Sequence, residues 1–228
     1  MFRAITDDSR CPADVLCVWA YISQIRVDEL QANFPDAAQF SYRFLQVFGD
    51  VPGKMSAQWA DRGGLPGYAA HVQEVAAKFP HIAISPQAWV TNPPTSSLPA
   101  HLVICAANVL SNSDPAGANP GLADNLLKAL RHAFFVETVD ISNHQALMAV
   151  VEQAGIDLKA IQRVMDSGAA HAQLAADLAA AAQSAVRASP TLLFNEGRQM
   201  LSGNVGYRVL EANIRELLLD PGEQQSWC

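Results

Sequence analysis

Segments with strand character stand only near the two ends of this 228-residue chain, and the long middle is helical in character. Near the start, residues 2–6 predict a short strand, and the residues after it, through Cys11 and Pro12, predict a polar loop. A helical pattern runs from Val18 to about Asn33, and residues 40–45 show the alternation typical of a strand. A strand, a helix and a strand in this order form a parallel pair with a right-handed crossover.

The other end carries the remaining strands. Residues 191–194 and 199–201 flank a turn of Asn195-Glu196-Gly197, which predicts a hairpin, and residues 209–218 predict a final helix. Between the two ends, six segments have helical spacing or composition, namely 66–79, 98–110, 121–135, 143–154, 157–166 and 168–187. We therefore expect an α/β fold in which residues 1–55 and 185–228 form one domain and residues 56–184 form a large helical insertion domain.

Composition limits the classes of function. The net charge of −7, with no basic cluster, argues against a nucleic-acid surface. No apolar run is long enough to cross a bilayer, and the start lacks the layout of a signal peptide, so we expect a cytoplasmic protein without a membrane partner. The six histidines show no metal-ligand spacing, which predicts no metal site.

The four cysteines are too few for a disulfide scaffold and are predicted to be reduced. Cys17 stands where the first helix begins, and a helix N-terminus favours an anion by roughly 0.3–1 kcal/mol. We expect this position to lower the pKa of the Cys17 thiol and to provide a thiolate at neutral pH. The alternative is a buried, inert cysteine, and for Cys105 burial between helices is the prediction.

The Ser189-Pro190 step opens the late strand. Peptide bonds before proline are the ones that readily adopt the cis form. A cis proline at this point would expose the backbone of Ser189 to an extended partner, which could then pair by strand addition. The alternative is a trans proline at the first residue of a strand.

Together, Cys17-Val18-Trp19-Ala20-Tyr21 and the late run Pro190-Thr191, Asn195-Glu196-Gly197-Arg198 and Leu201-Ser202-Gly203 resemble the DsbA-like branch of the thioredoxin superfamily. That branch includes FrnE-type proteins, 2-hydroxychromene-2-carboxylate isomerases and kappa-class glutathione transferases. The likeness covers about residues 14–50 and 185–219. It implies a thioredoxin-like fold, with Cys17 as the nucleophile and Ser189-Pro190 as the cis-proline step.

One departure from the family's pattern bears on mechanism. The redox members carry a motif like C-P-W-C-Y, and Ala20 stands where that motif has its second cysteine. Cys17 therefore cannot close the usual disulfide, and a mixed disulfide would need a thiol of glutathione, of the substrate, or of Cys11 on the predicted loop. The leading prediction is a thiol–disulfide oxidoreductase or isomerase that acts on a small thiol or disulfide-containing substrate through Cys17 alone, with glutathione as its cofactor.

Two other functions stay open. The resemblance also allows a glutathione-dependent isomerase or transferase that acts on a small aromatic substrate, with Trp19, Tyr21 and Thr191 at the substrate, although such members typically have serine where Cys17 stands. A non-catalytic module that binds extended peptides is the third reading. Each of them is compatible with a homodimer.

Overall fold

The computed structural model describes residues 9–35, 40–91, 93–113, 121–184, 186–194 and 199–218. Its sheet has the strand order β2-β1-β3-β4. β1 (Ser9–Ala13) pairs in parallel with β2 (Phe40–Phe44) and antiparallel with β3 (Thr191–Phe194), which pairs antiparallel with β4 (Gln199–Ser202). The two central strands thus come from opposite ends of the chain; the sequence predicted that both ends contribute to one domain, but not the strand order.

The first strand lies further along the chain than predicted. The segment expected as a loop is β1, and it holds Cys11 and Pro12 in register with Tyr42 and Arg43 of β2. The predicted strand at residues 2–6 lies outside the described residues. Proline within a run argues against a central strand, which is why the local pattern was misleading here. The neighbours of Pro12, Cys11 and Ala13, are each only 2% exposed, so long-range burial decides the conformation.

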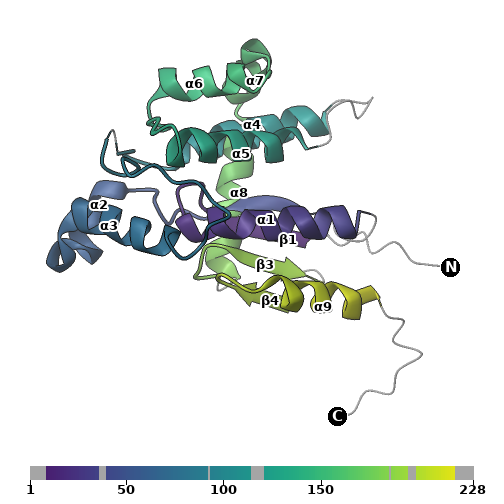
Figure 1. Cartoon of the computed structure of the whole chain (residues 1–228). Coiled ribbons are helices and arrows are strands. Elements are labelled where there is room, and N and C mark those ends of the chain that lie inside the picture. The colour runs from purple at the N-terminus through teal and green to yellow at the C-terminus, as the bar shows by residue number, and fades with distance from the viewer. Residues whose placement is uncertain are drawn as a thin grey trace.

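Two helices pack beside this sheet. α1 (Val18–Asn33) connects β1 to β2, and α9 (Tyr207–Leu218) follows β4 and contacts α1 (Figure 1). A buried cluster joins them to the strands through Cys11, Val27, Leu30, Leu192, Phe194, Leu210 and Ile214. The start and end of the chain are therefore held together by one apolar layer.

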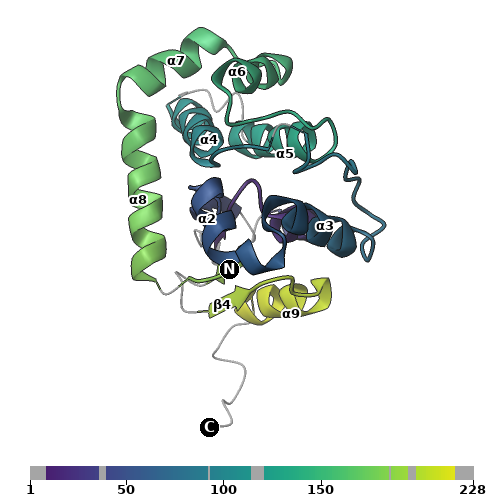
Figure 2. The same cartoon turned by 90° about the vertical axis from the view of Figure 1, so that its left-hand side faces the viewer.

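The middle of the chain is helical, as expected. Its elements are α2 (Val51–Gln58), the short 3₁₀ helix η1 (Ala60–Arg62), α3 (Gly64–Ala76), α4 (Leu98–Asn112), α5 (Leu122–Phe135), α6 (His144–Gln153), α7 (Leu158–Asp166) and α8 (Ala169–Gln183). Figure 1 shows α4, α5, α6 and α7 on the side of α1 away from α9, and Figure 2 shows α8 running from α7 back toward the sheet.

The helix α2 was not predicted. It contains Pro52 and Gly53 in its first turn, residues that usually end a helix when they lie in its interior. In the first turn proline is well tolerated because its missing N–H needs no partner there. Asp50 caps the helix, with its side chain accepting a hydrogen bond from the Gly53 N–H.

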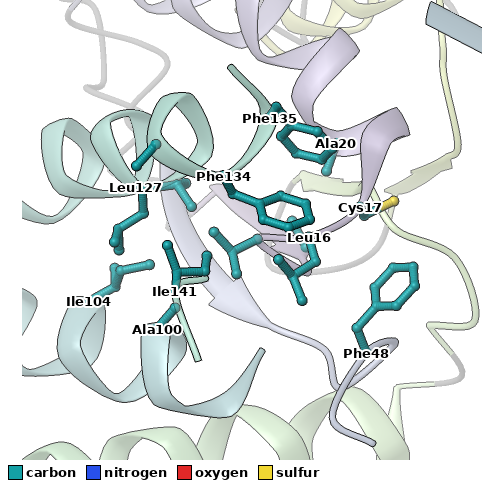
Figure 3. Packing of buried hydrophobic residues seen from close by; sticks show 14 of the residues in the cluster. Leu16, Cys17, Ala20, Phe48, Ala100, Ile104, Leu127, Phe134, Phe135 and Ile141 are labelled. Carbon is teal, nitrogen blue, oxygen red and sulfur yellow. The ribbon is translucent and has the colours of Figure 1, made fainter. Parts of the chain in front are cut away.

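One large core connects the sheet to the helical middle. It includes Leu16, Cys17 and Ala20 on one side and Leu127 and Phe134 on the other, all buried (Figure 3). The predicted domain boundary after residue 55 falls inside α2. The division into two domains stays a prediction. No described helix is both long enough and apolar enough to cross a membrane.

Candidate active site

The turn between β1 and α1 positions Cys17. The Cys17 N–H donates to the Asp14 carbonyl at 3.1 Å, and the Leu16 N–H donates to Asp14 Oδ1 at 2.9 Å. Cys17 is the N-cap residue of α1, in extended conformation, and its carbonyl accepts from the Tyr21 N–H at 3.0 Å. Val15, Leu16 and Val18 are fully buried around it, so the thiol sits on a rigid support.

The Ser189-Pro190 step faces this turn, and its peptide bond is cis. The Cys17 thiol donates to the Ser189 carbonyl, with Sγ 3.2 Å from the oxygen, although 172 positions separate the two residues. The Ser189 hydroxyl oxygen accepts from the Asp14 N–H at 3.0 Å. Figure 3 shows the Cys17 sulfur directed away from Leu16 and Phe134. The structure thus brings together the two segments that the sequence singled out.

The charge state of Cys17 differs from the expectation. The side chain is only 6% exposed, and this burial raises the pKa of the Cys17 thiol above its ordinary value. Hydrogen bonds from the Ser189 side chain and the Ala20 N–H act in the opposite direction, and the charge of Asp14 adds to the rise. The prediction of a lowered pKa was wrong because desolvation exceeds what the helix terminus supplies.

A buried carboxyl group stands beside the thiol. Asp14 is fully buried, and its Oδ2 accepts from the Phe48 N–H at 2.9 Å and from the Ser97 hydroxyl at 2.8 Å. Burial raises the pKa of this carboxyl to about 6, against the lowering effect of its hydrogen bonds. Asp14 therefore ties the turn to the loop after β2 and to the start of α4. The sequence signal was an acidic residue inside the apolar run from Ala13 to Leu16, and it was missed.

His101 supports the same turn from α4. Its Nε2 accepts from the Val15 N–H at 3.1 Å and lies 3.7 Å from Asp14 Oδ1, and its ring stacks on Phe44 at 4.3 Å. Burial, aided by the charge of Arg131, lowers the pKa of His101 to about 3. The imidazole is therefore neutral at neutral pH, with Nε2 as acceptor and the proton on Nδ1. The sequence analysis assigned no role to His101, because the six histidines show no metal-ligand spacing.

The predicted substrate-binding residues have different surroundings. Trp19 packs edge-on against Phe79 at 5.9 Å, and Tyr21 stacks on Phe135 at 4.8 Å; both are partly exposed. Thr191, in contrast, is fully buried, and its hydroxyl donates to the Ala188 carbonyl at 2.7 Å. The Thr191 side chain therefore holds the segment before Pro190 in place and is not available to a substrate.

Cys11 does not lie on a loop. It is buried in β1, and burial raises the pKa of its thiol to about 12. Cys11 belongs to the cluster beneath α9, whereas Cys17 belongs to the large core on the other side. The structure contains both as free thiols, and it gives no support to Cys11 as a resolving thiol. Cys105 is fully buried in α4, which confirms the prediction for that residue.

Residues of the loop after β2 and of the helices α2 and α3 complete the surroundings of the thiol. Figures 1 and 2 place α2 and α3 at the end of the sheet where α1 begins. The Phe48 ring lies 5.6 Å from that of Tyr68, and the Lys54 ammonium lies 5.1 Å from the centre of the Phe48 ring. Among the described residues, no group of three or more histidine, cysteine, aspartate or glutamate side chains could hold a metal ion.

The fold and the site define a protein of the thioredoxin superfamily with a buried thiol at a helix start, in contact with a cis-proline step. The family model of the DSBA-like thioredoxin domain matches residues 13–215. The chain belongs to this family, which confirms the resemblance drawn from the sequence. The family is that of DsbA-like thiol–disulfide oxidoreductases, and this membership supports an oxidoreductase or isomerase role.

Individual relatives are more distant. The ClpXP adapter protein SpxH of Bacillus licheniformis is 31% identical over 120 residues, which are 50% of this chain and 39% of that protein. The alignment thus spans well under two thirds of the curated relative.

Among solved structures, a candidate protein disulfide isomerase from Nitrosomonas europaea has a TM-score of 0.73 at 15% identity, covering 93% of this chain and 97% of that one. The cytosolic disulfide reductase DsbM of Pseudomonas aeruginosa has a TM-score of 0.65 at 16% identity, covering 92% and 99%. A 2-hydroxychromene-2-carboxylate isomerase has a TM-score of 0.59 at 16% identity, covering 96% and 99%. These likenesses show the fold.

Proposed function

We propose that the protein is a thiol–disulfide oxidoreductase or isomerase that works through Cys17 alone, with glutathione as the second thiol. The observation that carries the proposal is the contact of Cys17 Sγ with the Ser189 carbonyl at the start of α1. Ala20 follows three positions later, so the helix offers no second thiol there. Cys11 cannot serve as that second thiol, because it is buried and burial raises its pKa to about 12.

The proposed reaction has two exchanges. The Cys17 thiolate attacks one sulfur of a disulfide, a mixed disulfide forms, and the other sulfur leaves as a thiolate that takes up a proton. A second thiolate, from glutathione or from the substrate itself, then attacks the mixed disulfide and releases Cys17. With glutathione the net change is one substrate disulfide and one glutathione thiol converted to a glutathione mixed disulfide and one substrate thiol. With the substrate's own thiol the net change is isomerisation.

The surroundings of Cys17 control the first exchange. Because burial raises the pKa of the thiol, the thiolate is a minor species at neutral pH. The Ser189 side chain and the N–H groups of Ala20 and Trp19 favour the thiolate by hydrogen bonding. The Ser189 carbonyl, which accepts the thiol hydrogen bond in the resting site, is available to an extended substrate once the proton has left.

Two features of the neighbours support glutathione as the partner and the cytosol as the location. DsbM of Pseudomonas aeruginosa is described as a cytosolic disulfide reductase, and a structure of it with GSH is also similar to this chain, with a TM-score of 0.64 at 16% identity. We propose the same co-reactant and compartment for this protein. A homodimer stays a prediction.

The proposal is tested by exposing the purified protein to oxidised glutathione and mapping the adduct by peptide mass spectrometry. A glutathione adduct on Cys17 is expected, together with reduction of hydroxyethyl disulfide by glutathione that is lost in Cys17→Ala. An unmodified Cys17 after prolonged exposure, with no exchange above that of Cys17→Ala, would contradict the proposal.

A second candidate is favoured by the neutral state of the Cys17 thiol. A neutral thiol is a hydrogen-bond donor, and such a donor can hold the thiolate of bound glutathione instead of attacking a disulfide. The similarity to a 2-hydroxychromene-2-carboxylate isomerase supports this glutathione-dependent isomerase or transferase. Cys17→Ser separates the two functions, since a serine hydroxyl can donate but cannot exchange disulfides. Activity retained in Cys17→Ser toward a small aromatic substrate favours the second candidate.

A third candidate is a non-catalytic module that binds extended peptides, and the description of the curated relative as an adapter protein supports a binding role. The backbone of the partly buried Ser189 would be the docking edge, as proposed from the sequence. Full resistance of Cys17 to alkylation in the native protein, with peptide binding retained in Cys17→Ala, favours this candidate.

A further inference from the structure

A groove lies between α3 and the loop that follows it, and none of the groups of the proposed exchange line it. Its volume is about 330 Å³, which is at the small end of the range for ligand pockets and suits a one-ring molecule better than a polypeptide. Figure 2 shows this loop beside α3 and α5. The side chains that line the groove are almost all apolar and include Leu65, Pro66 and Ala69 on α3, and Pro86, Trp89 and Val90 on the loop.

Hydrogen bonds hold the loop in position beside α3. The Ser85 N–H donates to the Phe135 carbonyl at 2.8 Å, and the Ser85 carbonyl accepts from Gln73 Nε2 at 2.9 Å. The same carbonyl accepts from the Ala88 N–H at 3.0 Å, which closes a turn just before Trp89. The groove is therefore formed before anything binds in it, so that binding does not have to order the loop.

Trp89 has two features that are unusual for a buried tryptophan. Its backbone lies in the left-handed region, with φ 68°, which is a strained conformation for a bulky residue. Its side chain is only 1% exposed, and its Nε1–H is buried without a hydrogen-bond partner among the described residues. A buried indole N–H usually has a partner, and strained backbone concentrates at ligand-binding sites. Both features are explained if a ligand supplies the missing acceptor.

The protein itself holds the Trp89 ring in place. The rings of Tyr68, Phe48 and Phe134 pack against it, with centroid distances of 4.9, 5.1 and 5.1 Å. Because these contacts restrain the indole, it cannot turn toward an acceptor elsewhere in the core, and an acceptor has to come to it. The groove is the open space that Trp89 lines.

The lining limits the chemistry of the occupant. None of the described residues that line the groove is charged, so a charged group that entered it would lose its hydration without gaining a partner. Gln73 is the polar residue of the lining, and its amide nitrogen is already bonded to the Ser85 carbonyl. Val90, on the loop, is 56% exposed and makes the rim apolar as well. An apolar molecule with one hydrogen-bond acceptor therefore matches both the lining and the Trp89 N–H.

We propose that this groove is a binding site for a small, uncharged, apolar molecule that carries a carbonyl or similar acceptor, with the Trp89 N–H as the donor. The inference goes beyond the proposed function and does not depend on the reaction of Cys17. The two sites are connected through Phe48, whose ring packs on Trp89 and whose N–H is bonded to Asp14 in the Cys17 turn.

The test titrates acetophenone into the full chain labelled with nitrogen-15 tryptophan and follows the four indole N–H signals by NMR. Replacing the tryptophans with phenylalanine one at a time identifies the Trp89 signal. We expect a saturable downfield shift of the Trp89 indole proton, as formation of a hydrogen bond produces. α-Methylstyrene has the same shape with a methylene group in place of the carbonyl oxygen, and it should bind without this downfield shift. Benzoate should bind at least about tenfold more weakly than acetophenone, because its charge finds no partner in the groove.

Ala70→Phe, on the exposed side of α3, places a larger side chain in the groove and should weaken acetophenone binding at least about fivefold. Ala179→Phe is the matched control, since Ala179 is exposed on α8 and does not line the groove, and it should bind as the wild type does.

An unmoved Trp89 signal at saturating acetophenone, or an equal downfield shift with α-methylstyrene, would overturn the inference. So would a Trp89 signal that moves with protein concentration alone, because a second copy of the chain would then occupy the groove. None of these measurements uses a thiol or a disulfide, so their outcome is independent of whether Cys17 exchanges disulfides.

Discussion

Cys17 and Cys11 lie six positions apart, are both free and are both buried, yet their surroundings differ. Cys17 ends a turn at the start of α1, and its sulfur meets a carbonyl from the distant Ser189. Cys11 lies within a central strand, in register with Tyr42, and is enclosed by the apolar layer under α9. Burial raises the pKa of both thiols, but only Cys17 has hydrogen-bond donors that oppose the rise.

The comparison teaches that burial alone does not decide whether a thiol can react. A sulfur at a helix start keeps unpaired backbone N–H groups within hydrogen-bonding distance. Such a thiol can lose its proton and form the thiolate when a substrate displaces the carbonyl to which it is hydrogen-bonded. A sulfur inside a strand has no such donors, because the backbone groups are used in the sheet. The four predictions that follow test this difference, from the largest expected effect to the smallest.

The strongest test replaces each cysteine separately. Cys17→Ala should reduce disulfide exchange with glutathione by at least about a hundredfold, since it removes the nucleophile of the proposed reaction. Cys11→Ala should leave the rate within about twofold, because its thiol is inaccessible. The measurement is reduction of hydroxyethyl disulfide by glutathione. A comparable loss in both variants would break the distinction between the two thiols.

The pH dependence of exchange is the next test. Because the pKa of Cys17 is raised, each pH unit below that pKa should change the thiolate fraction, and with it the rate, about tenfold. The rate should therefore keep rising from pH 6.5 to beyond pH 8.5. A rate that levels off near pH 7 would show that the thiol ionises as the sequence alone suggested, and that burial does not govern it.

The buried His101, which supports the Cys17 turn, should make the stability of the protein depend on pH in acid. The pKa of His101 is about 3 in the folded protein and near its ordinary value of 6.5 in the unfolded chain. The unfolded chain therefore binds the extra proton first, and stability is lost as the pH falls from 6.5 toward 3.

His101→Gln keeps an acceptor for the Val15 N–H and removes the titrating ring. We expect its loss of unfolding free energy between pH 7 and pH 4 to be smaller than that of the wild type by about 2 kcal/mol, measured by urea denaturation at each pH. His171→Gln is the control, because His171 is exposed on α8. Equal acid sensitivity in wild type and His101→Gln would show that the turn is not supported in this way.

The smallest effect concerns the hydroxyl of Ser189. Ser189→Ala removes a group that opposes the raised pKa of Cys17 and also frees the Asp14 N–H. Alkylation of Cys17 at pH 7.5 should slow about threefold, which corresponds to the low end of the net contribution of a single hydrogen bond. Ser184→Ala, at the exposed end of α8, serves as the control and should not change the rate. A faster Cys17 in Ser189→Ala would contradict the role of this hydroxyl.

The sequence alone was enough to place the main parts of this fold. The helix that begins after Cys17, the hairpin after Pro190 and the helical middle follow from local periodicity and turn residues, which act over a few neighbouring positions. The resemblance of two short segments placed the chain in its family, and Cys105 was recognised as buried. These features depend on nearby residues, so a linear pattern contains them.

Other features were decided only by tertiary structure. β1 forms through Pro12 because β2 and β3 enclose it, and α2 tolerates Pro52 and Gly53 in its first turn because Asp50 caps it. The turn at Cys17 depends on Asp14 and His101, whose partners lie in distant segments. The sequence placed the thiol at a helix start, but the sign of its pKa shift comes from desolvation, which depends on everything that packs around the sulfur. Local pattern determined where the chain turns, and the packing of distant segments determined what the buried groups can do.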